Sequence, residues 1–232
     1  MPTKVVTAKR RTPANLAATE LASTILDELR QLPAATTPSV RSVRRRYSKD
    51  LGDASPDLVL AVVKRLLAES TWATRVVAYE LVLGHRAAMG RLDSRWIEKM
   101  AEGLSDWGSV DVFGVTVAGT AWREGRIGDE QVMRWARSQD RWRRRLALVA
   151  TVPLNSKARG GVGDADRTLA ICRTLAADRD DMVVKALSWA LRELSKRDPR
   201  AVSSFVEKET ARLASRVRRE VRTKLETGRK VR

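Results

Sequence analysis

An aspartate and a tryptophan stand one helical turn apart in the segment SDWGSVDVFG, where Asp111 follows Trp107 by four residues. Residues at this spacing lie on the same face of an α-helix. A carboxylate there can stabilise a developing positive charge or deprotonate water, and an indole ring attracts a cation to its face. The chain carries a net charge of +17, with 45 Lys and Arg against 28 Asp and Glu. This combination indicates a nucleic-acid site that contains reactive groups.

Trp107 is the middle member of three tryptophans that stand 35 residues apart, and such a fixed period is typical of stacked helical repeats. The copies begin TWATR at Thr71, DWGSVD at Asp106, DRWRRR at Asp140 and DDMVVK at Asp180. Each is expected to start the second helix of a pair, with a polar cap before an aromatic residue or Met. The glycine-rich segment 155–163, expected to form a loop, delays the fourth copy.

One charged residue occupies the same place in each copy, and the four are Arg75, Asp111, Arg145 and Lys185. Because equivalent positions line one edge of a repeat stack, we expect these groups on a shared concave face, with Trp189 one turn beyond Lys185. Arg75 and Lys185 are expected to contact DNA there. The alternative for Asp111 is an ordinary helix-surface salt bridge with Arg75 or Arg145. Packing is the preferred interpretation of Trp122, Trp135, Trp72 and Trp142, and Trp96 is expected in the core or at its edge.

Strand signals are nearly absent, and apolar residues recur three to four positions apart. Ser55-Pro56-Asp57 and Asp198-Pro199 mark helix starts, and Gly52, Gly90, Gly103 and Gly125 mark ends. The expected helices, which would form about six pairs, are 14–31, 38–50, 56–68, 70–83, 93–103, 107–122, 129–137, 140–152, 164–177, 180–196, 199–210 and 211–226.

Composition narrows the class of protein. We expect one repeat domain over residues 14–228, between a basic arm (1–13) and a basic tail (229–232). No apolar run is long enough to span a bilayer, so no membrane contact is expected. Cys172 and His85 are each the single residue of their type, which excludes an internal disulfide and the usual zinc sites. We therefore expect a protein of the reducing cytoplasm without a metal or cofactor.

Two arginine-rich segments are expected to hold DNA phosphates through Arg41, Arg44 and Arg45 in one short helix, and Arg218, Arg219 and Arg222 near the C-terminus. The alternative is that these charges form solvated helix faces. No recognition helix or zinc finger is present, so binding should not depend on base sequence. Gly160–Asp164 lacks the Gly-Lys-Ser/Thr ending of a phosphate loop.

The repeat period together with WxxxD in SDWGSVDVFG, WxxR in DRWRRRLALV, and KALSWALRELSKRDP resembles the AlkD-type DNA alkylation repair proteins over roughly residues 20–230. These are HEAT-like repeat DNA glycosylases. The resemblance implies an all-α, right-handed α-α superhelix with a basic concave groove. It also implies a monomer that acts on alkylated double-stranded DNA, in the bacterial cytoplasm with the nucleoid.

The resemblance assigns catalytic places to Trp107, Asp111 and Trp189, and a backbone contact to Arg145, with Arg144 as the alternative register. Gly108 departs from the acid or aromatic residue that relatives often carry after the tryptophan. Hydrolysis of the N-glycosidic bond of cationic N3- or N7-alkylpurines follows, and the resemblance implies that the lesion can be processed while still stacked. The alternative is a non-catalytic HEAT-repeat protein that binds damaged or branched DNA; a protein–protein scaffold would not need so many arginines.

Overall fold

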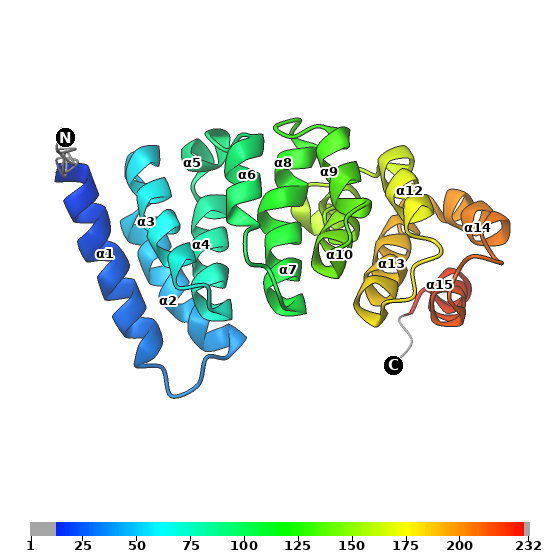
Figure 1. The fold of residues 1–232 in the computed structure, drawn as a ribbon, viewed down its shortest axis with the longest axis horizontal. Coiled ribbons are helices and arrows are strands. Elements are labelled where there is room, and N and C mark those ends of the chain that lie inside the picture. The colour runs from blue at the N-terminus through cyan, green and yellow to red at the C-terminus, as the bar shows by residue number, and fades with distance from the viewer. Residues whose placement is uncertain (1–12, 230–232) are drawn as a thin grey trace, which may run out of the picture. The chain divides into compact units, whose positions relative to one another are not determined.

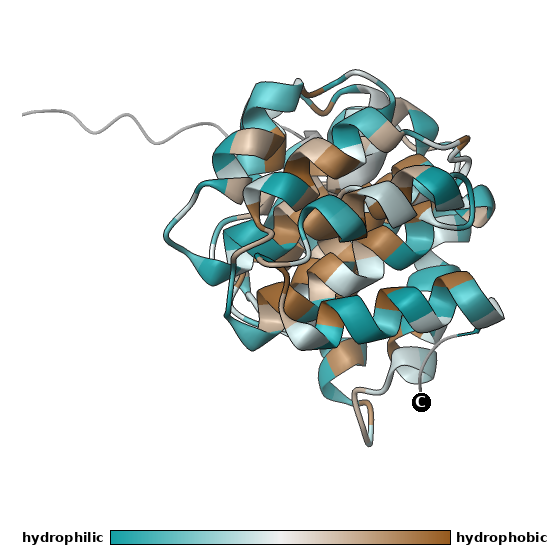
Figure 2. Cartoon of the chain, turned by 90° about the vertical axis from the view of Figure 1, so that its right-hand side faces the viewer, coloured by the Kyte–Doolittle hydropathy of each residue, from teal (hydrophilic) through white to brown (hydrophobic). Residues whose placement is uncertain are grey.

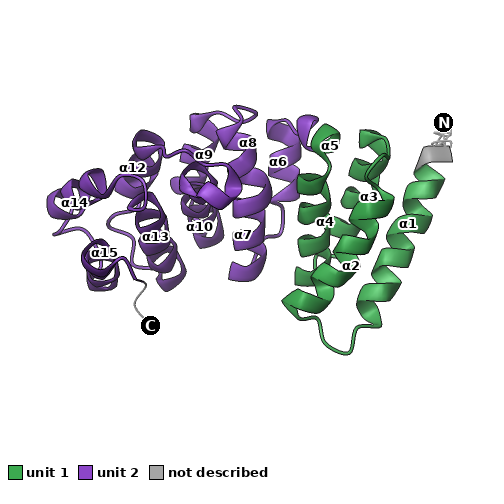
Figure 3. Ribbon diagram, turned by 180° about the vertical axis from the view of Figure 1, so that it is seen from behind, with its two compact units in different colours: residues 1–88 green, residues 89–232 purple. Residues whose placement is uncertain are grey.

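The computed structural model describes residues 13–229, and every regular element within that range is a helix. The expected basic arm and tail lie outside this range, except for Pro13 and Arg229. The chain divides into two compact units, residues 1–88 and 89–232, as Figure 3 shows. The single domain expected over residues 14–228 therefore stays a prediction, and the units are described separately.

Unit 1 contains α1 (Pro13–Arg30), α2 (Thr37–Asp50), α3 (Pro56–Ala68) and α4 (Trp72–Gly84), and α5 (Arg86–Gly90) contains the boundary. Helix α3 packs between α1 and α4, and α2 also packs on α4. The start of α3 follows the sequence signals, because the Ser55 side chain accepts the N–H of Leu58 at 3.2 Å and Pro56 occupies the first turn. Val59, Val62 and Val63 bury its inner face.

Unit 2 begins with α6 (Ser94–Met100), α7 (Trp107–Phe113), a π-helical turn η1 (Gly114–Ala118) and α8 (Gly119–Arg123). It continues with α9 (Asp129–Ala136), α10 (Arg141–Val149), α11 (Val152–Asn155), the 3₁₀ turn η2 (Lys157–Arg159), α12 (Ala165–Thr174), α13 (Asp181–Leu194), α14 (Pro199–Lys208) and α15 (Ser215–Thr227). Helix α10 packs against both α7 and α13, and α13 packs against α15 (Figure 1). Apolar residues occupy the inward turns of these helices (Figure 2).

The four repeat copies begin as the sequence predicts. The side chains of Thr71, Asp106, Asp140 and Asp180 each accept a backbone N–H two or three residues further on, at 3.2, 2.8, 2.9 and 2.9 Å. Each of these residues precedes the first residue of its helix, so the caps fix where α4, α7, α10 and α13 start. The charged position of each copy is thereby placed in the first or second turn.

The helix expected over residues 107–122 is interrupted by the π-helical turn, which the sequence analysis did not predict. Gly119 donates its N–H to the oxygen of Gly114, five residues back, in place of the ordinary α-helical partner. The Thr116 hydroxyl donates a hydrogen bond to the main-chain oxygen of Val112 at 2.6 Å, and the Arg159 guanidinium donates to the main-chain oxygen of Val115 at 3.2 Å. Side-chain donors therefore contribute to satisfying the backbone around the changed register.

Four smaller differences separate the expected helices from the structure. Helix α5 was not predicted, the helix expected over 140–152 ends at Val149 and is followed by the short helix α11, segment 155–163 contains η2, and the last helix starts at Ser215 instead of residue 211. Gly103 and Gly125 follow helix ends and adopt left-handed backbone angles, with φ of 65° and 72°. Among the helices described here, none is long and apolar enough to cross a membrane.

Candidate active site

Helix α7 places Trp107 and Asp111 one turn apart at its exposed start. The cap at Asp106 makes Trp107 the first helical residue, and its side chain is 61% exposed. Asp111 lies in the next turn, where its side chain is only 19% exposed. A solvent-exposed aromatic ring is thus followed, one turn later, by a carboxylate that is largely shielded from solvent.

Asp111 is held by Arg145 of α10 through two parallel hydrogen bonds. Nε donates to Oδ1 and Nη2 donates to Oδ2, both at 2.8 Å. Arg145 also donates from Nη1 to the main-chain oxygen of Met182 at 2.5 Å, and its side chain is 7% exposed. This bidentate geometry fixes the plane of the carboxylate, and it ties α7, α10 and the start of α13 together.

The protonation of Asp111 reflects two opposing effects. Burial raises the pKa of Asp111 above its usual value of 3.8, because the charged form loses hydration. The hydrogen bonds and positive charge of Arg145 lower the pKa, but less than burial raises it. The pair therefore keeps a carboxylate in a place where water alone would not stabilise its charge.

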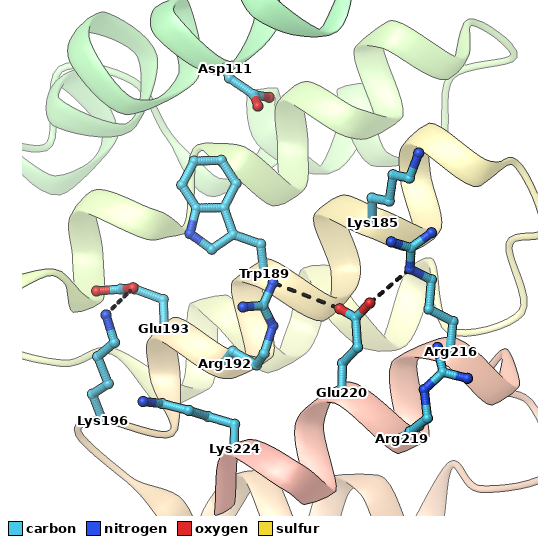
Figure 4. Close-up of a pocket in the computed structure, with 10 residues that line it drawn as sticks. All are labelled: Asp111, Lys185, Trp189, Arg192, Glu193, Lys196, Arg216, Arg219, Glu220 and Lys224. Atoms are coloured by element: carbon cyan, nitrogen blue, oxygen red, sulfur yellow. Dashed lines mark hydrogen bonds and ion pairs between the residues drawn. The ribbon is translucent and has the colours of Figure 1, made fainter. Parts of the chain in front are cut away.

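A pocket of about 850 Å³ opens beside Asp111 and extends between α13 and α15. In Figure 4, the indole of Trp189 extends from α13 toward the side of the pocket where Asp111 lies. The remaining lining residues are all charged, and they are Lys185, Arg192, Glu193, Lys196, Arg216, Arg219, Glu220 and Lys224. Asp111 and Trp189, which the sequence analysis placed together, therefore line one cavity, whereas Trp107 is not among its lining residues.

A hydrogen-bonded network around Glu220 connects the two helices. Glu220 accepts from Ser188 at 2.6 Å and from Arg216 at 2.8 Å, and Arg192 approaches it at 3.8 Å. Burial would raise the pKa of Glu220, but the hydrogen bonds from Ser188 and Arg216 outweigh it and lower the pKa. Glu220 therefore helps to hold the guanidinium groups of Arg216 and Arg192 in place in the pocket.

Several arginines expected at DNA phosphates have protein partners instead. Arg144 pairs with Asp178 at 2.7 Å, and Arg75 is buried with its guanidinium 2.9 Å from the Tyr79 hydroxyl. Arg41 and Arg44 both bind Glu80. Arg145 is covered by its own ion pair, so a phosphate can meet it only if that pair rearranges.

Other residues of the expected DNA-binding set reach solvent. Arg45, Arg219 and Arg222 are exposed, and Arg218 is half-buried. Lys185 is half-buried and pairs with Asp181 at 2.6 Å, an acid of the same helix. These side chains are available to a polyanion in the structure, in contrast to Arg75, Arg144 and Arg145.

The remaining tryptophans differ in how far they are buried. Trp122 and Trp135 are buried and donate to Asp129 and Glu98 at 2.7 and 2.6 Å, which confirms their packing role. Trp72, Trp96 and Trp142 are half-buried. His85 bonds to the main chain at Ala54 and Ala88, and Cys172 is buried.

Arg192, Glu193 and Lys196 were missed as site residues. Arg192 and Glu193 follow Trp189 on α13 by three and four positions, so they lie near the face that carries Lys185 and Trp189, and Lys196 lies in the turn just after the helix. That spacing was available as a signal. Arg216 and Lys224 belong to the C-terminal arginine-rich segment but were not among the residues expected to hold DNA phosphates.

Comparisons with known proteins identify the family and the fold class. A family model described as DNA alkylation repair enzyme matches residues 12–225. Among solved structures, the chain is similar to one described as a predicted DNA alkylation repair enzyme from Enterococcus faecalis. The two share 16% sequence identity and a TM-score of 0.65, over 94% of this chain and 97% of that chain. This likeness confirms the all-α, HEAT-like repeat class. A search of curated proteins gave no match.

Proposed function

Because the chain belongs to the family of DNA alkylation repair enzymes, we propose that it is a DNA glycosylase that hydrolyses the N-glycosidic bond of cationic N3- or N7-alkylpurines in duplex DNA. The observation that carries this proposal is the Asp111 carboxylate. It is withdrawn from water, fixed in orientation by Arg145, and directed to a pocket that also contains the indole of Trp189.

The chemistry requires little more than such an anion. Alkylation at N3 or N7 places a positive charge on the purine, so the base leaves with the electrons of the C1′–N bond and becomes neutral. The positive charge then moves to the sugar, which acquires oxocarbenium character. An anion fixed beside the sugar stabilises this state more than the ground state, because it does not have to reorient as the charge develops.

Water completes the reaction by bonding to C1′, and its proton must be removed. The carboxylate form of Asp111 can accept that proton, because the side chain lines the pocket. Arg145 acts as a positioning residue in this scheme: it holds both carboxylate oxygens, and its charge opposes the rise in the pKa of Asp111. The contact of Arg145 with a DNA phosphate remains a prediction.

Trp107 and Trp189 provide aromatic faces for a cationic nucleotide, each contributing about 0.5–2 kcal/mol. A neutral purine gains no such attraction and is a poor leaving group. Discrimination against undamaged DNA therefore follows from the charge of the lesion, with no need for base-specific contacts. Lys185, Arg45, Arg218, Arg219 and Arg222 are the proposed phosphate contacts, because each reaches solvent at least in part.

The test is release of 7-methylguanine from methylated duplex DNA in single-turnover reactions with wild type and Asp111→Asn. We expect release by wild type and a loss of about 10²–10³-fold in the variant, the magnitude typical of removing a preorganised electrostatic group. Glu80→Gln is the matched control, since it neutralises another arginine-paired carboxylate that does not line the pocket.

Two outcomes would contradict the proposal in different ways. Absence of base release by folded wild-type protein that still binds the duplex would favour the non-catalytic DNA-binding alternative. Equal release by wild type and Asp111→Asn would retain the activity but remove Asp111 from the mechanism.

A further inference from the structure

The pocket beside Asp111 is positively charged on balance. Six of its lining residues are cations, namely Lys185, Arg192, Lys196, Arg216, Arg219 and Lys224, and three are acids. Two of the acids are already engaged: Glu220 binds Arg216 and Ser188, and Glu193 binds Lys196 at 2.6 Å. The pocket therefore combines fixed cations with acids that hold them, an arrangement suited to an anionic ligand.

The cations of the pocket lie on two neighbouring segments of the chain. Lys185 and Arg192 lie on one face of α13, Lys196 lies in the turn just after it, and Arg216, Arg219 and Lys224 lie on the side of α15 that borders the pocket (Figure 4). From Lys185 to its last residue, Leu194, α13 rises by about 14 Å. Successive phosphates of one DNA strand advance only about 3.4 Å along the duplex axis. The pocket is thus long enough for more than one phosphate.

Arg219 is the cation of the pocket that has no side-chain partner within the described residues. Its side chain is exposed, and it has no hydrogen bond or ion pair with any residue from 13 to 229. Arg216, by contrast, is bound to Glu220 and Asp181. An arginine fork without a protein partner, in a pocket lined by further cations, can bind a phosphate with two parallel hydrogen bonds.

We propose that the α13–α15 pocket binds consecutive phosphates of the DNA backbone on one side only of the nucleotide at Asp111, with Arg219 as a principal contact. The inference rests on the proposed function for the location of the damaged nucleotide. It adds a polarity: the DNA flank on the pocket side contributes to affinity through Arg219, and the opposite flank does not. Trp189 and Asp111 mark the end of the pocket where the damaged nucleotide lies.

The test measures binding, so that it does not depend on base release. Two fluorescent duplexes of equal length carry one stable abasic-site analogue, near the 5′ end of its strand in the first and near the 3′ end in the second. Each duplex therefore has a long flank on only one side. Affinities are measured by anisotropy for wild type, Arg219→Gln and the charge-conserving Arg219→Lys.

We expect Arg219→Gln to weaken binding of one duplex roughly tenfold, as for loss of one charge-assisted contact. The other duplex, which has little DNA on the pocket side, should change less than about twofold, and Arg219→Lys, which keeps the charge but not the fork, should recover only part of the loss. Arg200→Gln is the matched control: it removes an equally exposed arginine of unit 2 that does not line the pocket. It should affect both duplexes equally.

Equal weakening of both duplexes by Arg219→Gln, or no weakening of either, would overturn the proposal. Because Arg219 is exposed, the variant is expected to fold, and circular dichroism checks this. A duplex-dependent loss in a protein that releases no base would support the pocket assignment while contradicting the glycosylase proposal. The two inferences can therefore fail separately.

Discussion

Two carboxylates, one in each unit, are held by arginines in different ways. Glu80 of α4 accepts hydrogen bonds from Arg41 at 2.7 Å and from Arg44 at 3.0 Å, and both arginines belong to α2. Asp111 of α7 is held by the single buried Arg145 and borders a pocket. The Glu80 side chain is 9% exposed and that of Asp111 is 19% exposed, so burial alone does not separate them.

The difference lies in what remains on the open side of each carboxylate. Each oxygen of Glu80 has its own arginine, and the cluster fastens α2 to α4 within unit 1. Arg145 holds Asp111 from within the protein, and the pocket side is left to other groups. A carboxylate has about four acceptor positions, so Asp111 can keep its pair and still face a sugar or a water molecule. Arginine pairing is thus compatible with either role.

The largest expected effect distinguishes the arginines of the two clusters. Arg145→Leu leaves Asp111 largely buried without its partner, and we expect it to lower the free energy of unfolding by about 3 kcal/mol. Arg44→Leu leaves Glu80 with Arg41 and should cost about 1 kcal/mol or less, since both arginines are partly exposed. Urea denaturation measures both values. Similar losses in the two variants would mean that Asp111 and Glu80 are equally structural.

A smaller effect extends the comparison to the tryptophans of unit 2. Trp107→Ala removes an exposed ring, so the free energy of unfolding should change by about 0.5 kcal/mol or less. Base release should fall by up to roughly 30-fold, the equivalent of about 2 kcal/mol of cation–π attraction. Trp122→Ala, which removes a fully buried ring, should instead destabilise by about 3–5 kcal/mol. Unchanged single-turnover release by Trp107→Ala would remove Trp107 from the site.

The smallest effect is a displacement along the pH axis. Because burial raises the pKa of Asp111, single-turnover release should fall on the acid side with a midpoint above the usual 3.8. Arg145→Gln should move this midpoint further upward, since Arg145 lowers the pKa. The folded state also binds this proton more tightly than the unfolded state, so acidification through the window above 3.8 should stabilise wild type relative to Asp111→Asn. Coincident rate profiles for wild type and Arg145→Gln would contradict this account.

Local rules predicted the elements of the site better than its contacts. The caps at Asp106 and Asp180 are encoded by adjacent residues, and they correctly placed the starts of α7 and α13. Burial of Trp122 also followed from its place in an apolar run. The sequence offered a salt bridge between Asp111 and either Arg75 or Arg145, and only packing of α10 against α7 identifies Arg145.

The pocket and the π-helical turn depend on tertiary structure. Glu220 stands more than 30 residues from Ser188, and their contact requires α15 to pack on α13. Gly114 and Gly119 are the residues in the sequence that mark the π-helical turn. A Cβ atom on Gly114 would lie 2.6 Å from Cγ1 of Val149, and one on Gly119 would lie 2.5 Å from the oxygen of Ala150. Their spacing of five was present in the sequence, but its cause is the close approach of neighbouring segments.

The π-helical turn lies between two parts of one continuous helical segment, and each part has its own required orientation. A π-turn accommodates one more residue than an α-turn, which rotates everything after it by about 100° relative to an uninterrupted helix. Trp107 and Asp111 lie before that rotation, whereas the fully buried residues Val117, Ala118 and Ala121 lie in or after it. The direction in which Trp107 and Asp111 point is therefore not tied by regular helical spacing to the direction in which the buried residues after residue 116 point. Conversion of residues 114–118 to regular α-helix, with no residue removed, would rotate one end by about 100° relative to the other, and one end would lose its proper orientation.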